Sequence, residues 1–210
     1  MPDLLDILQN WWPVPLAYLI GATPFGFLAG KIKGIDIRDH GSGNIGATNV
    51  MRTLGKPVGV TVLLLDILKG VAPVMVALFS SEKSIIPIAA SVGAILGHNY
   101  TFWLGFKGGK GIATTAGAVL PLMPYAILFA VLAWLVTLKI SRYVSVASIT
   151  AATAIPTEVL VESLIKDRFD IPTFCFALFV CLLAIWKHRS NIGRLKQGEE
   201  PKTGLEKSTL

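Results

Sequence analysis

The sequence has 210 residues, of which 53% are hydrophobic and only 15% are charged. The apolar residues gather in long blocks, which excludes a soluble globular domain and predicts an all-α, polytopic membrane helical bundle. The net charge of +6 does not indicate a nucleic-acid partner, because the basic residues collect at the ends of the apolar blocks. We expect one integral-membrane domain over residues 1–210, since no room remains for a second.

About seven membrane segments follow one another along the chain. Their approximate ranges are 12–30, 57–79, 85–101, 112–122, 125–140, 144–160 and 171–186. The fourth rises roughly 17 Å, less than the ~30 Å of a hydrocarbon core, so it predicts a half-helix that turns back within the membrane. A charged loop is expected over 162–170, and a basic tail is expected after 187.

The distribution of lysine and arginine predicts the orientation. With the N-terminus outside and the C-terminus in the cytoplasm, fifteen basic residues lie inside and three lie outside. The N-terminus lacks the basic region of a cleavable signal, so the first segment is expected to stay in the membrane. Three polar clusters, at 41–52, 97–114 and 188–200, then all face the cytoplasm.

The cluster at 97–114 is a glycine-rich loop that ends where an apolar run resumes at Ile112. Glycines allow close approach of the backbone, and a helix N-terminus favours an anion. The loop contributes Lys107, Gly108, Gly109, Lys110 and Gly111 as candidate phosphate ligands. It is not the nucleotide P-loop, because Leu104 and Gly111 stand where that motif needs Gly and Ser or Thr. The alternative is a tight turn with snorkelling lysines.

The cluster at 41–52 is dense in small and hydrogen-bonding residues. Its candidate ligands for a polyol or a phosphate are Ser42, Gly43, Asn44, Asn49 and Arg52. The alternative is a short helix with Ser42 as its N-cap. Both interpretations can hold together.

The cluster at 188–200 supplies His188, Asn191, Arg194 and one of two adjacent glutamates, of which Glu199 is taken as the candidate and Glu200 is the alternative. The alternative is a basic anchor for anionic lipid, which alone would need neither Asn191 nor the glutamates. His98, before the glycine loop, is either a ligand or a structural hydrogen-bonding residue.

Two further polar pairs lie inside apolar segments. Asp66 and Lys69 stand three apart on one helix face, where they form a structural ion pair or contact the substrate. Ser145 and Ser148, at the start of the sixth segment, could reach the cytoplasmic pocket that the three polar clusters would form. Hydrogen bonding back to their own helix is the more common behaviour of such serines.

Several catalytic signatures are absent. No histidine is followed five positions on by an aspartate, no G-x-S-x-G elbow occurs, and no aspartate array or cysteine spacing suits a metal. We therefore expect no metal and no cofactor. A catalyst with these residues works mainly by positioning and electrostatics.

The three clusters together resemble the bacterial membrane glycerol-3-phosphate acyltransferases that use acyl phosphate. The matching stretches are 41–49 with Arg52, His98 with 106–111, and His188 with 191–195, Gly198 and one of the glutamates 199 and 200. The resemblance covers nearly the whole chain. It implies a multi-pass protein of the bacterial inner membrane, with its active site at the cytoplasmic face.

The resemblance also implies the reaction. An acyl group would pass from acyl phosphate to the sn-1 hydroxyl of glycerol 3-phosphate, giving lysophosphatidic acid and phosphate. A soluble enzyme would supply the acyl phosphate. Ser42, Arg52, His98, Lys110 and Asn191 are the expected catalytic residues, and the other candidates named above, Lys69 among them, are expected to bind substrate. The alternative from another class is a small transporter of phosphate-bearing anions, since the short segment at 112–122 would suit one.

Overall fold

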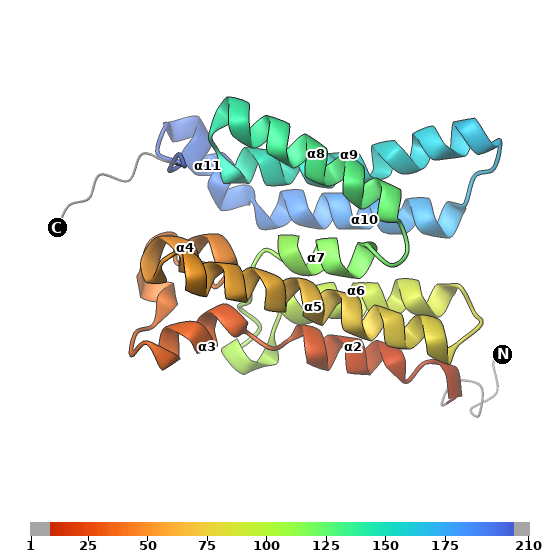
Figure 1. The fold of residues 1–210 in the computed structure, drawn as a ribbon, viewed down its shortest axis with the longest axis horizontal. Coiled ribbons are helices and arrows are strands. Elements are labelled where there is room, and N and C mark those ends of the chain that lie inside the picture. Colours follow the sequence, from red (N-terminus) through yellow and green to blue (C-terminus); the bar gives the residue numbers. More distant parts are fainter. Residues whose placement is uncertain (1–8, 204–210) are drawn as a thin grey trace. The chain divides into compact units, whose positions relative to one another are not determined.

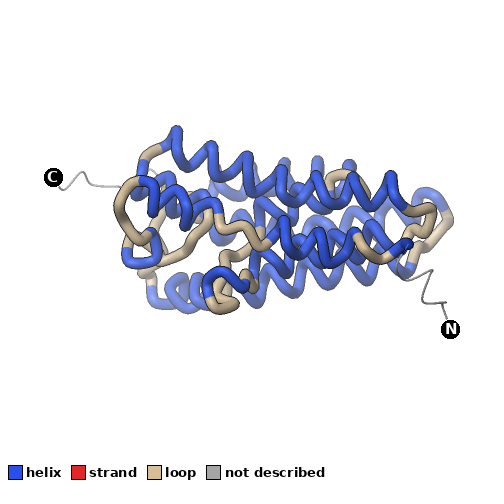
Figure 2. Tube along the Cα trace, turned by 90° about the horizontal axis from the view of Figure 1, so that it is seen from below, coloured by secondary structure: helices blue, strands red, loops and turns tan. Residues whose placement is uncertain are grey.

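The computed structural model describes residues 9–203, and within that range the regular structure is entirely helical (Figures 1 and 2). The helices form two compact units, one ending at Leu122 and one beginning at Met123. The assignment of one domain to the whole chain stays a prediction. The chain ends, whose sides of the membrane were predicted from charge, lie outside the described residues.

The first unit contains the two polar clusters at 41–52 and 97–114. Its elements, in chain order, are α2 (Pro13–Gly21), α3 (Phe25–Ile32), the 3-10 turn η1 (Ile37–Asp39), α4 (Ala47–Leu54), α5 (Lys56–Ser80), α6 (Ile85–Asn99), the 3-10 turn η2 (Phe102–Leu104) and α7 (Ile112–Val119).

The second unit contains four helices. They are α8 (Pro124–Ser141), α9 (Val144–Lys166), α10 (Ile171–Lys187) and α11 (Arg189–Gln197). Within this unit α9 packs against both α8 and α10 (Figure 1). The buried faces carry small and branched residues such as Ala147, Ile155 and Val180.

Five described segments are long and apolar enough to cross a membrane. They are Pro13–Ile32, Lys56–Ser80, Ile85–Leu104, Pro124–Ser141 and Val144–Lys166. A sixth results if α10 and α11, which meet at a bend of 50°, count as one span. The short segment predicted before Pro121 is α7, which has eight residues. These features confirm the all-α membrane class, whereas the number of spans and their orientation stay predictions.

Two predicted boundaries are wrong. The first segment is interrupted between Gly21 and Phe25, because Pro24 cannot donate a backbone hydrogen bond. The loop expected from Glu162 is helical as far as Lys166, and an ion pair between these two residues one turn apart supports that end of α9. The basic tail begins with the helix α11, so its polar residues stand on a defined surface.

Glycines bring α5 and α7 into direct backbone contact within the first unit. A Cβ added to Gly70 would come within 2.3 Å of the Thr114 carbonyl oxygen, and one added to Gly117 within 2.1 Å of the Ile67 carbonyl oxygen. Small residues at such crossings let helices approach closely in a bilayer, where van der Waals packing drives association. The short helix α7 is therefore held along the middle of α5.

Candidate active site

The break between α2 and α3 exposes backbone carbonyl groups that two distant side chains satisfy. The Thr101 hydroxyl donates to the Ala22 carbonyl at 2.5 Å, and the Lys69 ammonium donates to the Thr23 carbonyl at 2.7 Å. A helix interruption leaves carbonyl groups without their usual partners, and leaving them unpaired inside apolar surroundings is costly. The break thus ties α5 and the segment after α6 to one point.

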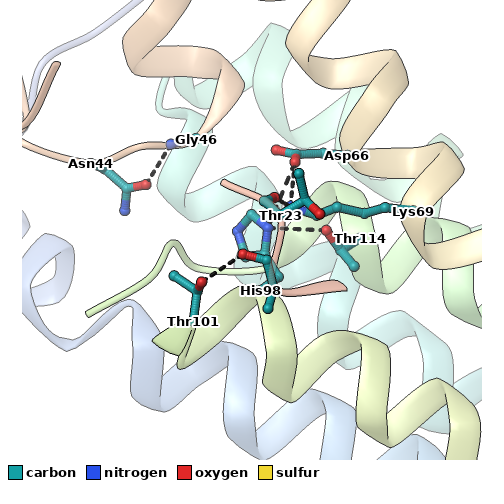
Figure 3. A network of polar contacts seen from close by, with 9 residues as sticks. Thr23, Asn44, Gly46, Asp66, Lys69, His98, Thr101 and Thr114 are labelled. Atoms are coloured by element: carbon teal, nitrogen blue, oxygen red, sulfur yellow. Dashed lines mark hydrogen bonds and ion pairs between the residues drawn. The ribbon is translucent and has the colours of Figure 1, made fainter. Parts of the chain in front are cut away.

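Asp66, Lys69, His98 and Thr114 form a buried polar network at this point (Figure 3). Asp66 and Lys69 are 2% and 4% exposed, and the Lys69 Nζ lies 2.7 Å from Asp66 Oδ1. His98 Nδ1 lies 3.2 Å from Thr114 Oγ1 and 3.8 Å from Asp66 Oδ1. The network therefore connects α5, the end of α6 and the first turn of α7.

The end of α6 holds the glycine loop by its backbone. The Gly108 and Gly109 N–H groups donate to the carbonyl oxygens of Asn99 and His98, each at 3.2 Å. These two amide hydrogens are therefore used within the protein, and the expectation that Gly108 and Gly109 bind phosphate stays a prediction. The backbone amides at the start of α7, which have no partner within their own helix, are a further place where an anion could bind.

The loop ends as the sequence predicts, with the helix α7 beginning at Ile112. Its N-cap, Gly111, has a φ of 80°, in the left-handed region that glycine occupies without strain. Lys107 is exposed and Lys110 is half-buried. Lys110 thus stands between a residue held against α6 and the first turn of α7.

Asn49 organises the backbone of the cluster at 41–52. Its Oδ1 accepts from the Ser42 N–H at 2.9 Å, and its Nδ2 donates to the carbonyl oxygens of Ile37, His40 and Asn44 at 2.9–3.2 Å. The side chain is 2% exposed. An amide group used so fully is a loop organiser, and the geometry does not favour the predicted substrate contact.

Some of the remaining residues of this cluster stabilise its backbone, and others are exposed to solvent. Helix α4 has Gly46 as its N-cap, so the interpretation of Ser42 as a cap is wrong. The Asn44 Oδ1 accepts from the Gly46 N–H at 2.8 Å. Ser42 and Gly43 are exposed, and Arg52 lies half-buried in the last turn of α4. Ser42 and Arg52 are the members whose placement best suits a ligand.

The first two clusters meet within the first unit. Leu104, from the turn before the glycine loop, packs against the core formed by Ile45, Ala47 and Val50. A Cβ on Gly26 of α3 would come within 1.8 Å of the Ile45 carbonyl oxygen, so the 41–52 segment also lies directly on α3. The clusters at 41–52 and 97–114 and the pair Asp66–Lys69 are therefore parts of one compact body.

The third cluster lies in the second unit and centres on Glu200. This carboxylate accepts from Asn191 Nδ2 at 2.7 Å and from Arg194 Nε at 2.8 Å. Burial alone would raise the pKa of Glu200, but interactions with Ser145, Asn191 and Arg194 outweigh it and hold the pKa below its ordinary value. The Ser145 hydroxyl contributes from close by without meeting hydrogen-bond geometry.

The two candidate glutamates differ sharply in environment. Glu200 is 9% exposed and paired, whereas Glu199 is exposed on the surface. Glu200, and not Glu199, therefore contacts the candidate residues Asn191 and Arg194, and the substrate role expected of Glu199 stays a prediction. Arg194, predicted as a phosphate ligand, already neutralises Glu200, which lowers the positive charge that it offers to a substrate.

His188 has a defined tautomer at the junction of α10 and α11. Its Nδ1 lies 2.7 Å from the Ala184 carbonyl oxygen, which can only accept, so Nδ1 carries a proton.

Ser145 and Ser148 are both buried on α9. The expected hydrogen bond from Ser145 back to its own helix does not form. After Glu200 the chain is fixed by the Thr203 N–H, which donates to the Arg142 carbonyl at 2.8 Å.

Residues that sequence reasoning missed include Thr101 and Thr114. Neither threonine carries a motif signal, because a hydroxyl inside an apolar segment normally bonds to its own helix. Only the three-dimensional placement shows that one closes the α2–α3 break and the other holds His98.

Comparison with known proteins identifies the family. The family model described as glycerol-3-phosphate acyltransferase matches residues 11–198. Glycerol-3-phosphate acyltransferases of Desulforamulus reducens and Geotalea daltonii are 48% and 47% identical over 193 and 184 residues, covering 91% and 88% of this chain and 94% and 92% of theirs.

Two solved structures of PlsY (YgiH), an integral membrane glycerol 3-phosphate acyltransferase, are also similar. One is a glycerol 3-phosphate form and the other a lysophosphatidic acid form, with TM-scores of 0.86 and 0.83. Each is 41% identical in sequence and covers 92% of this chain and 94% of its own. The chain therefore belongs to the glycerol-3-phosphate acyltransferase family and is an integral-membrane enzyme of that family.

Proposed function

We propose that this acyltransferase takes its acyl group from acyl phosphate and transfers it directly to the sn-1 hydroxyl of glycerol 3-phosphate. The products are lysophosphatidic acid and inorganic phosphate. The observation that carries the proposal is the likeness, over 92% of the chain, to structures described as glycerol 3-phosphate and lysophosphatidic acid forms, which are the acceptor and the product of this reaction.

Acyl phosphate suits these residues as the donor because it is an activated mixed anhydride. The acceptor oxygen attacks the carbonyl carbon and a new C–O bond forms. The bond between the carbonyl carbon and the bridging oxygen breaks, and its electron pair leaves on the phosphate. The hydroxyl proton passes to a phosphate oxygen of a substrate, whose second pKa near 6 is suitable. The protein then needs only to hold two anions in line and stabilise the developing charge.

The basic residues of the first unit are assigned to phosphate. Arg52 and Lys110 bind it, with Lys107 adding charge at the exposed side of the loop. Two placements support this assignment. Lys110 is fixed between Gly109, bonded to α6, and Gly111, which starts α7. Arg52 stands on α4, whose entry is organised by Asn49.

Ser42 is assigned to the glycerol hydroxyls, and the substrate role expected of Asn191 stays a prediction. Ser42 is exposed, with its backbone fixed by Asn49. Asn191 is oriented by Glu200, which accepts from its Nδ2 and directs its carbonyl oxygen away from the carboxylate. His98, Asn44 and the loop glycines support the site in the first unit, and the roles expected of Ser145, Ser148 and His188 stay predictions.

An acyl-enzyme on Ser42 is not supported by the positions of the buried histidines. His98 Nδ1 faces Thr114 and Asp66, and His188 Nδ1 donates to Ala184. A serine nucleophile requires an adjacent base. A substrate phosphate replaces that base in the direct reaction, so no covalent intermediate is needed. The alternative of a transporter has no support among the similar proteins, which are acyltransferases.

We assign the active site to the cytoplasmic face of the bacterial inner membrane, where a soluble enzyme would deliver acyl phosphate. The surplus of basic residues on the loops expected to be cytoplasmic supports this orientation. The acyl chain would stay in the bilayer while its phosphate end reaches the loops.

Turnover of the purified protein tests the donor. Radiolabelled glycerol 3-phosphate is offered in detergent with acyl phosphate, acyl-CoA or acyl carrier protein as separate donors. We expect labelled lysophosphatidic acid with acyl phosphate alone. Arg52→Gln should abolish it, whereas Arg38→Gln should not, because the Arg38 guanidinium is paired with Asp36. Equal turnover with acyl-CoA would overturn the assignment of the donor.

A further inference from the structure

The proposed reaction gives no direct role to Asp66, Lys69 or Thr114, which belong to the buried network at the α2–α3 break. An ion pair inside a membrane helix is costly unless both charges are paired and hydrogen-bonded. Here Lys69 reaches Asp66, the Thr23 carbonyl and the face of Phe25, whose ring centroid lies 5.4 Å from Nζ. Its ammonium group is thus satisfied within the protein, which leaves a role in positioning.

His98 connects the buried network to the glycine loop. The network contacts Nδ1 of its ring, and the loop packs against Nε2. Thr114 and Asp66 stand at its Nδ1. On the other side, a Cβ on Gly109 would come within 2.2 Å of Nε2, so the loop backbone rests directly against the ring. The His98 carbonyl oxygen also accepts from the Gly109 N–H. A rotation of this ring therefore displaces Gly109, and with it Lys110.

We propose that Asp66, Lys69 and Thr114 are positioning residues that lock the His98 ring, and that the locked ring sets the place of Lys110 for the phosphate of glycerol 3-phosphate. This inference rests on the proposed role of Lys110. None of the three touches the substrate. Their effect reaches the reaction through the glycine loop, so it falls on the KM for glycerol 3-phosphate.

Thr114 offers the sharpest variant because its hydroxyl can be removed without changing its shape. Thr114→Val deletes the partner of His98 and keeps the volume, whereas Thr114→Ser keeps the hydroxyl. Ser91 is a matched control at the other end of the same helix pair. It is buried, and its hydroxyl lies 2.9 Å from the Pro87 carbonyl oxygen of its own helix and 3.1 Å from the Ala118 carbonyl oxygen of α7. Ser91→Ala removes a similar contact far along α7 from the loop.

Steady-state kinetics with purified protein in detergent separates positioning from stability. Thr114→Val and Asp66→Asn should raise the KM for glycerol 3-phosphate about tenfold, because a misplacement of about 1 Å in a binding group is costly. Thr114→Ser should restore the wild-type KM. Ser91→Ala should lower the Tm while leaving KM unchanged. A lower Tm with unchanged KM in Thr114→Val and Asp66→Asn would overturn the proposal.

A second measurement does not depend on turnover. Amide hydrogen exchange at 108–111, followed by mass spectrometry on substrate-free protein, should be faster in Thr114→Val than in wild type and unchanged in Ser91→Ala. Unchanged exchange in Thr114→Val would contradict the lock even if the enzyme used another donor. A wild-type enzyme that fails to turn over acyl phosphate, with the exchange difference intact, would instead overturn only the proposed function.

Discussion

Gly108 and Gly109 press their backbones against the end of α6, and the two contacts differ in kind. A Cβ on Gly108 would come within 2.0 Å of the His98 backbone carbonyl, whereas one on Gly109 would meet the His98 side chain. Backbone cannot yield without moving α6, but a ring can turn. We therefore expect Gly108→Ala to lower the Tm strongly, and Gly109→Ala to raise the KM for glycerol 3-phosphate with a smaller loss of stability.

Gly193 on α11 supplies the control for this comparison, because a Cβ there meets nothing within 4 Å. Gly193→Ala should leave both Tm and KM near the wild-type values. Thermal unfolding and steady-state kinetics of the three variants check the prediction. An unchanged KM in Gly109→Ala would return the loop to a purely structural role.

Glu200 gives the clearest dependence of stability on pH. Its pKa is lower in the folded protein than the ordinary value of 4.5, so the unfolded chain binds more protons and stability rises with pH through this range. The stabilisation is complete above about pH 4.5 and is lost as the pH falls through the folded pKa. Glu200→Gln should cost about 1–3 kcal/mol at pH 7, since the charge is lost and an NH2 donor replaces one of the two oxygens that accept from Asn191 and Arg194.

The neighbouring Glu199 is exposed, so Glu199→Gln is the matched control and should change little. The difference in Tm between wild type and Glu200→Gln should shrink as the pH falls below 4.5. A difference that stays constant down to pH 3 would show that the charge of Glu200 does not contribute.

At the scale of elements, the break at Pro24 and the short helix α7 give the first unit its polar interior. The break provides two carbonyl acceptors, and α7 brings Thr114 to His98. Both features are consequences of single residues, since Pro24 interrupts one helix and Gly111 starts the other.

The orientation of these elements in the membrane is tested by single cysteines in a background without Cys175 and Cys181. Exposed positions in the three clusters, Thr48, Lys107 and Lys196, should be protected from an impermeant thiol reagent in intact cells. Cysteines at Ser84 and Arg168, which are predicted to lie outside, should react. Ready labelling at the first three positions would overturn the orientation and the cytoplasmic site.

The positions of most helices could be predicted from the sequence, because long apolar runs and prolines are visible in the chain without knowledge of the fold. The half-helix α7 and its start at Ile112 were predicted in this way. The polar contacts could not be predicted, because they depend on which distant groups meet. The neighbouring sequence does not show that the Asn49 side chain bonds to its own loop whereas Asn191 bonds to Glu200. It also does not show that Glu200 is buried whereas Glu199 is exposed. The same applies to Thr114, whose partner lies on another helix.

At the scale of the whole molecule, the proposed reaction relies on positioning of the substrates and on side-chain charge. Among residues 9–203 no group of three His, Cys, Asp or Glu side chains is arranged to hold a metal ion. The expectation that turnover needs no divalent cation stays a prediction. Activity should be unchanged in excess EDTA and should not respond to added Mg²⁺, with Arg52 and Lys110 supplying the charge. Loss of turnover in EDTA that Mg²⁺ restores would contradict it.

The central claim is that the acyl group moves in one step from acyl phosphate to glycerol 3-phosphate. The most direct measurement is a rapid quench of enzyme mixed with labelled acyl phosphate and no acceptor. Ser42→Ala should lower turnover severely, because Ser42 orients the acceptor, but neither wild type nor variant should carry acyl label. Stoichiometric labelling of the wild type that Ser42→Ala abolishes would contradict direct transfer and identify Ser42 as a nucleophile.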